Sequence, residues 1–309
     1  MKRFKNILFF ADRHDGLTST LSRVIALSKA NNARLTIMDV TPDSGLADYY
    51  NQTYDIDLNA QLREQRLQSL EQLTASHASM DVPVSTRVVT GIPFIEVIRS
   101  VQHNNHDLVV KVAQHDTALA TSLFGSTDMH LLRKCPCPVW IDHLQNEPVY
   151  HRILAAVDPL DDKSPDLQHL IMDLATSIAA QEQASLEVVH AWDLPGESLL
   201  ASGHGRIPRH ELDLILERKE QHHRQALDEL LSSYNMSSQA DNVHLIKGRA
   251  TEVISDAVTQ QNIDLIVMGT LGRVDIPGLF IGNTAEEVLR KTRAAALTVK
   301  PSSFISPVQ

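Results

Sequence analysis

The sequence FKNILFFAD at residues 4–12 returns as HRILAAVD at residues 151–158. In both copies a short apolar run is followed by an aspartate, which predicts a buried strand that ends in a turn. Further matches follow in the same order: DLVV at 107–110 with DLIV at 264–267, FGST at 124–127 with IGNT at 281–284, and LLRK at 131–134 with VLRK at 288–291. The repeat exceeds the roughly 20 to 50 residues of a solenoid unit, so each copy is expected to be a whole domain.

Strand-like and helix-like patterns alternate along both halves. The patterns predict strands near 5–11, 34–40, 84–89, 107–112 and 137–141, and again near 151–157, 185–191, 243–246, 263–268 and 296–299. Helical spacing of apolar residues lies between them, as at Leu167, Leu170, Ile171, Leu174, Ala175 and Ile178. We therefore predict an α/β protein with two tandem, doubly wound, parallel five-stranded sheets, in domains 1–145 and 150–309.

Composition limits the classes of partner. The chain has 309 residues, 43% of them hydrophobic and 21% charged, which is typical of a soluble globular protein of two ordinary domains. Its net charge of −10 argues against nucleic acid and acidic membrane surfaces as partners. No stretch reaches the roughly 18 apolar residues of a membrane span, and the apolar run at 7–11 is too short for a signal peptide. A cytoplasmic location is expected.

Glycines cluster after the predicted strand at 263–268. They are Gly269, Gly272 and Gly282, and a helix is expected to begin near Thr284. Ligands of open parallel sheets bind beyond the carboxyl ends of the strands, and a helix N-terminus suits phosphate. The stretch also fits a structural role, because Thr284 and Glu287 have the spacing of a capping box.

The chain resembles the universal stress protein family over nearly its full length, and its tandem two-domain members most. Nucleotide-binding members carry Gly-x2-Gly-x9-Gly-Ser/Thr, which the three glycines match, although Asn283 replaces the Ser or Thr. The resemblance implies the fold shared by these proteins and the adenine-nucleotide α-hydrolases. It also implies a site for ATP or AMP in the second domain, with Mg²⁺ as a companion of the nucleotide. The residues assigned to this site are Asp158, Ala191, Met268, Gly269, Leu271, Gly272, Gly282, Asn283 and Thr284.

The first half lacks the full motif. Val112 and His115 stand where the second half has its first two motif glycines. A β-branched residue tolerates positive φ poorly, and its side chain would fill space that a phosphate needs. Lys111, one position earlier, could supply a compensating charge. We expect this half to be structural or to hold a different ligand.

Histidines and cysteines offer other candidate sites. Zinc needs three or four converging ligands, so most of the 15 histidines, including His103, His106, His222 and His223, are expected to be solvated. His190 falls in a predicted buried strand and is expected to be a hydrogen-bonded core residue. Cys135 and Cys137 are expected to form a buried, inert thiol pair.

An alternative function is a binding module for a non-nucleotide small molecule or a lipid-like metabolite, with or without a metal ion. A long loop at about 193–210 carries the apolar residues Leu194, Leu199, Leu200 and Ala201. The sequence shows no positioned nucleophile, general base or complete metal site, so at most a slow ATPase is expected. The resemblance further implies an intrachain pseudo-dimer in which 137–141 pairs with 296–299, and it leaves further homodimerisation open.

Overall fold

The computed structural model describes residues 3–12, 17–43, 45–75, 82–113, 124–143, 149–161, 164–202, 207–270 and 282–309. Their contacts divide them into two compact units. The first unit extends to Val149 and includes Ala295–Gln309, whereas the second begins at Tyr150 and includes Gly282–Ala294.

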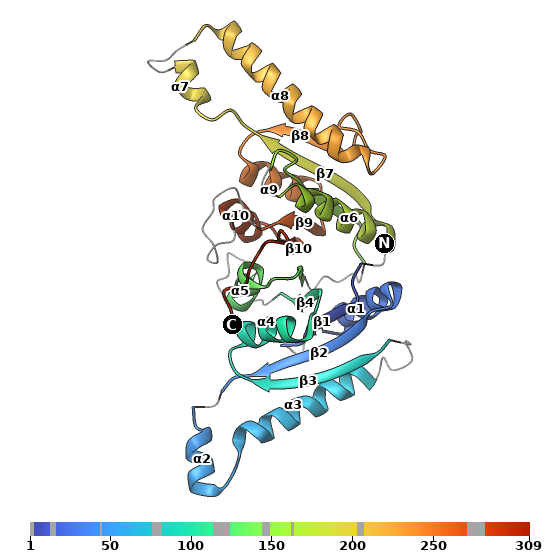
Figure 1. Ribbon diagram of the computed structural model, residues 1–309, viewed down its shortest axis with the longest axis vertical. Coiled ribbons are helices and arrows are strands. Elements are labelled where there is room, and N and C mark those ends of the chain that lie inside the picture. Colours follow the sequence, from blue (N-terminus) through green and yellow to red (C-terminus); the bar gives the residue numbers. More distant parts are fainter. Residues whose placement is uncertain are drawn as a thin grey trace. The chain divides into compact units, whose positions relative to one another are not determined.

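The first unit is built on five parallel strands in the order β3-β2-β1-β4-β5 (Figure 1). In chain order its elements are β1 (Asn6–Phe10), α1 (Leu17–Asn31), β2 (Arg34–Thr41), α2 (Ala47–Tyr54), α3 (Leu58–Ala75), β3 (Val84–Thr90), α4 (Pro93–Asn104), β4 (Leu108–Val112), α5 (Ser126–Lys134) and β5 (Val139–Asp142). Every residue of β1 and β4 is buried, as expected for strands covered on both faces.

The last strand of the chain, β10 (Ala295–Val299), belongs to the first unit by its contacts. It pairs antiparallel with β5, with Leu297 opposite Trp140. This pairing of the final strands of the two repeats is the one that the resemblance implied.

The second unit repeats the arrangement with strands in the order β9-β6-β7-β8, all parallel (Figure 1). Its elements are β6 (Arg152–Ala156), α6 (Pro165–Glu182), β7 (Ser185–Trp192), α7 (Glu197–Ser202), α8 (Arg209–Ser232), β8 (Val243–Lys247), α9 (Ala250–Gln260), β9 (Leu265–Gly269) and α10 (Asn283–Lys291). Because β6 pairs with β7 on one side and with β9 on the other, the strand order reverses there. A crevice at the carboxyl ends of these strands is the expected place for a ligand.

The tandem α/β prediction is confirmed, and each strand lies close to its predicted position. The helix face predicted after β6 is also found, since Leu167, Ile171, Leu174, Ala175 and Ile178 of α6 are buried. None of the helices in the described ranges combines the length and apolar character that crossing a bilayer requires.

Candidate functional site

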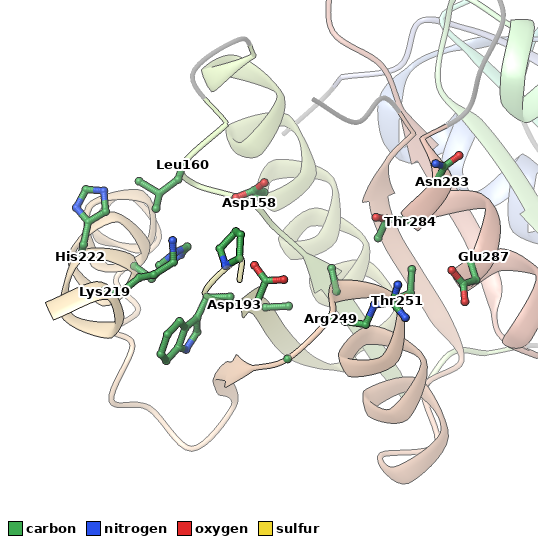
Figure 2. Close-up of a pocket in the computed structure, with 16 residues that line it drawn as sticks. Asp158, Leu160, Asp193, Lys219, His222, Arg249, Thr251, Asn283, Thr284 and Glu287 are labelled. Atoms are coloured by element: carbon green, nitrogen blue, oxygen red, sulfur yellow. The ribbon is translucent and has the colours of Figure 1, made fainter. Parts of the chain in front are cut away.

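A cavity of about 550 Å³ lies in the second unit, where β6, β7 and β8 end (Figure 2). Its walls come from the segments that follow these strands and from three helices. The lining residues are Asp158, Leu160, Ala191, Trp192, Asp193, Pro195, Lys219, His222, His223, Gly248, Arg249, Ala250, Thr251, Asn283, Thr284 and Glu287. The volume falls within the range of roughly 300–1,000 Å³ typical of small-molecule sites.

Two helix N-termini open onto this cavity. Helix α9 begins at Ala250 and α10 at Asn283, and residues of both first turns line the space. Neither helix has a side-chain cap among the described residues. The first backbone N–H groups of a helix have no partner inside the helix and carry the positive end of its dipole. This side of the cavity therefore suits an anion.

The expected capping box at Thr284 is wrong. The N-cap of α10 is Gly282, whose own N–H donates to the carbonyl oxygen of Thr270. Glu287 does not reach back to the helix start, because its carboxylate forms an ion pair with Lys291 at 2.6 Å. That ion pair lowers the pKa of Glu287. Among the described residues, no side chain therefore caps the first turn of α10.

Gly248 shapes the entrance to α9. Its φ is +156°, and a Cβ added there would lie 2.9 Å from Cγ2 of Val253. Glycine is therefore required for the chain to turn from β8 into the helix. The turn brings Arg249 and Thr251 to the cavity.

Helix α8 supplies the opposite wall. Lys219 projects from it towards the cavity, and Asp158 and Asp193 lie between Lys219 and Thr284 in Figure 2. His222 of the same helix also lines the cavity. Lys219 and Arg249 are cations that can pair with phosphate, while the two aspartates can accept hydrogen bonds from hydroxyl or amino groups. The cavity therefore presents both charges and favours a ligand with an anionic part and a neutral polar part.

A pair of histidines lies behind this wall. Nε2 of His190 is 2.8 Å from Nδ1 of His223, and Nδ1 of His190 is 3.1 Å from the carbonyl oxygen of Val157. His190 is thus a hydrogen-bonded core residue, as predicted. His223 is buried rather than solvated, and so is His106, whose ring contacts the side chains of Asn6 and Ser100.

Burial, and then the neighbouring His190, lowers the pKa of His223 from 6.5 to about 4. In the unfolded chain His223 is protonated below about pH 6.5, whereas in the folded chain it is protonated only below about pH 4. The folded state therefore loses stability relative to the unfolded state as the pH drops through this window. We expect the unfolding free energy of the second unit to decrease between pH 6.5 and 4 through this group.

Denaturant unfolding followed by Trp192 fluorescence in a Trp140→Phe background measures this loss, because these are the two tryptophans of the chain. His223→Asn should flatten the pH dependence between 6.5 and 4. If the unfolding free energy of wild type and His223→Asn depended on pH in the same way, His223 would not be the group responsible.

The structure places the predicted site residues in different ways. Met268 is 3% exposed and does not line the cavity. Gly269 lies against α6, where an added Cβ would be 3.1 Å from Cδ2 of Leu167, so helix packing accounts for its small size. Leu271 and Gly272, like His115 of the first half, lie outside the described residues. The remaining members that line the cavity are Asp158, Ala191, Asn283 and Thr284.

Sequence reasoning missed Trp192, Lys219 and Arg249, because no motif marks them. The loop residues expected to line an apolar pocket lie elsewhere: none of them borders this cavity, and Leu199 is 69% exposed. Within the described ranges, no group of three or more His, Cys, Asp or Glu side chains is arranged to hold a metal ion.

At the corresponding strand ends of the first unit, the described residues include three charged side chains that pair with one another. Lys111 of β4 is fully buried, and its Nζ lies 2.9 Å from a carboxylate oxygen of Asp12 and 2.7 Å from one of Asp128. It also donates to the carbonyl oxygen of Val112 at 2.8 Å. The charge that could have met a phosphate is already paired with two carboxylates. Burial raises the pKa of Asp12, an effect that Lys111 opposes.

Helix α5 differs from α10 at its first turn. Asp128, the third residue of α5, accepts a hydrogen bond from the N–H of the N-cap Gly125 at 2.8 Å. The third residue of α10 is Ala285, which has no carboxylate. The first unit thus places its own anion at the helix start, whereas the second unit leaves that position open.

These features define a tandem α/β protein with a cavity at the strand ends of its second unit. The model of one protein family, described as "Universal stress protein family", matches residues 3–143 and 149–300 of this chain. The chain belongs to the universal stress protein family, and so to a group of stress-response proteins.

Known relatives agree with this assignment. The chain is 30% identical over 250 residues to universal stress protein E of Escherichia coli K12, covering 79% of this chain and 77% of that protein. It is 25% identical to universal stress protein E of Photorhabdus laumondii, and the match covers 100% of this chain and 99% of that protein. A crystal structure of a protein of unknown function from Pseudomonas aeruginosa PAO1 matches the fold with a TM-score of 0.74 and 23% identity. The match covers 97% of this chain and 94% of that protein.

Proposed function

We propose that the second unit binds an adenine nucleotide, ATP or AMP, in the cavity at the ends of β6, β7 and β8. The nucleotide acts there as a regulatory or stabilising ligand of a cytoplasmic stress-response protein. The observation that carries the proposal is the contrast between the two related helix starts: Asp128 occupies the first turn of α5, while the first turn of α10 is open and lines a cavity.

The phosphates are assigned to the side formed by α9 and α10. Backbone N–H groups, the hydroxyls of Thr251 and Thr284, and the guanidinium of Arg249 supply donors for phosphate oxygens. The base and ribose are assigned to the side formed by Asp158, Ala191 and α8. A triphosphate would bring Mg²⁺ with it as a companion of its phosphate oxygens.

ATP is expected to raise the melting temperature of the purified chain. Ligand at 100 times its Kd should stabilise the folded protein by about 2.7 kcal/mol, an effect that differential scanning calorimetry resolves. No shift with ATP or AMP at millimolar concentration would overturn the proposal.

Gly282→Val should abolish this shift. The substitution puts a branched side chain at the N-cap of α10, directly before the N–H groups assigned to phosphate. Gly45→Val is the matched control, because a Cβ added at Gly45 meets nothing within 4 Å and lies in the other unit. ATP affinity in isothermal titration calorimetry should be lost in the first variant and unchanged in the second.

A further inference from the structure

The two cysteines of the chain lie in contact just after α5. Sγ of Cys135 is 3.6 Å from Sγ of Cys137, and both are free thiols. The chain bends at Pro136 and Cys137, between the helix and β5. Cys135 is fully buried, whereas Cys137 is half-buried. Because a disulfide bond is about 2.05 Å long, the two sulfurs need to approach by only about 1.5 Å to form one.

A buried lysine from the end of the chain lies beside this pair. The antiparallel register of β10 and β5, continued by two residues, brings Lys300 opposite Cys137. Its Nζ donates to the carbonyl oxygen of Leu132 at 2.7 Å, in the last turn of α5, directly before Cys135. Lys300 is 6% exposed, and burial lowers its pKa to about 8, against the opposing effect of the two cysteines. It is therefore still mostly a cation at pH 7.

This cation acts on both thiols. Burial would raise the pKa of Cys135, yet the hydrogen bond with Cys137 and the charge of Lys300 together bring it below its ordinary value. The hydrogen bond with Cys135 and burial raise the pKa of Cys137, and Asp107 adds to this, while Lys300 opposes it. The pair thus loses one proton and keeps the other between its sulfurs. A negative charge shared by two sulfurs in contact is the nucleophilic state of a dithiol.

The second repeat shows that the fold does not require thiols here. The sequence LRKCPC at 132–137 corresponds to LRKTRA at 289–294, so Thr292 and Ala294 stand in place of the two cysteines. Both are 2% exposed and fill the equivalent positions without sulfur. The inert thiol pair expected from the sequence would also need no cation beside it, because burying an ammonium group costs free energy. That cost is offset where the ammonium group faces a thiolate.

We propose that Cys135 and Cys137 form a dithiol that hydrogen peroxide oxidises to a disulfide, with Lys300 as the cation that holds the pair in its reactive state. This modification site is separate from the nucleotide cavity and does not depend on it.

The reaction takes two steps. Cys137 is the thiol that solvent reaches, and it carries the thiolate when the shared proton sits on Cys135. Its sulfur attacks one peroxide oxygen, the O–O bond breaks, and a sulfenic acid forms as hydroxide leaves. The sulfur of Cys135 then attacks that of Cys137, so an S–S bond forms, the S–O bond breaks and a second hydroxide leaves. The two thiol protons end on the two hydroxides, which gives one disulfide and two waters.

Intact-mass spectrometry of the full-length chain tests the proposal. Protein treated with hydrogen peroxide at pH 7, then unfolded and alkylated, should take up no alkyl group and be lighter by two hydrogen atoms. Untreated protein should take up two alkyl groups, and a reductant should restore both sites after oxidation. Two alkylated thiols after peroxide treatment, or stable oxygen adducts in place of the disulfide, overturn the proposal.

Cys135→Ala tests the order of the two steps. This variant leaves Cys137 without its partner, so the sulfenic acid should persist and react with dimedone to give a single adduct. A folded variant that gives no adduct contradicts the assignment of Cys137 as the thiol that peroxide reaches.

Lys300→Met tests the role of the cation. The rate of disulfide formation at pH 7 should fall about 10-fold, because a thiol pKa higher by about one unit leaves a tenth of the thiolate. The pH midpoint of the rate should rise accordingly, which altered packing alone would not cause. Lys134→Met is the matched control: Lys134 directly precedes Cys135, but its Nζ lies 4.6 Å from the centre of the Phe94 ring. It should keep the wild-type rate and midpoint. An unchanged midpoint in a folded Lys300→Met protein overturns the proposed role of Lys300.

Discussion

Replacing Lys111 with methionine is expected to lower the unfolding free energy of the first unit by about 3–5 kcal/mol. The side chain is fully buried between Asp12 and Asp128, at 2.9 and 2.7 Å. Methionine fills similar volume but carries no charge. The fully buried Asp128 and the largely buried Asp12 would lose the cation that compensates their desolvation, and this is the costly way to break a buried ion pair.

Denaturant unfolding in a Trp192→Phe background measures the effect, because Trp140 of β5 then reports on the first unit. The control is Lys29→Met, an exposed position near the end of α1, which should change stability by less than about 0.5 kcal/mol. Adding Asp12→Asn and Asp128→Asn to Lys111→Met should recover part of the loss, since neutral groups are cheaper to bury. Wild-type stability of the single variant would contradict the structural role of this cluster.

Replacing Ala285 with aspartate is expected to weaken ATP binding by at least about 100-fold, or about 2.7 kcal/mol. The change copies into α10 the carboxylate that Asp128 provides in α5, at the same third position of the helix. The new side chain would take the N–H groups assigned to phosphate and repel the phosphate charge. The same carboxylate favours the helix dipole, so the melting temperature should not fall in proportion to the loss of binding.

Ala285→Asn is the matched control for Ala285→Asp. Asparagine has nearly the same shape as aspartate and can still accept a hydrogen bond, but it has no charge. We therefore expect its affinity for ATP to lie between those of the wild type and Ala285→Asp. Ala285 is 3% exposed, so the melting temperature of each variant without ligand shows whether the fold is intact. Unimpaired ATP binding by a folded Ala285→Asp protein would show that phosphate does not contact the start of α10.

The strands were predictable because their signal is local. Runs such as 153–156 are apolar throughout, since parallel strands are covered on both faces, and turn residues follow them. The duplication strengthened each assignment, because a pattern seen twice in the same order is unlikely to arise by chance. The boundaries of α10 were less predictable: Thr284 and Glu287 have capping-box spacing, yet Gly282 is the N-cap and Glu287 pairs with Lys291.

The candidate site was predictable where it coincides with strand ends and with the glycine motif before α10, which led to Asn283 and Thr284. Asp158 follows β6 and Ala191 lies near the end of β7, so chain order alone places them at one edge of the sheet. His223 could not be assigned in this way. It lies on a long helix among charged residues, and its burial depends on packing against β7, which periodicity does not reveal.

The sequence alone therefore determined the duplication, the order of strands and helices, and the half that carries the fuller glycine motif, because these depend on local patterns of side chains. The tertiary structure alone decided that Lys111 pairs with two carboxylates, that α10 begins without a side-chain cap among the described residues, and that the buried rings of His190 and His223 are hydrogen-bonded to each other. These features join residues as far apart as Asp12 and Asp128, and only folding brings such groups within hydrogen-bonding distance.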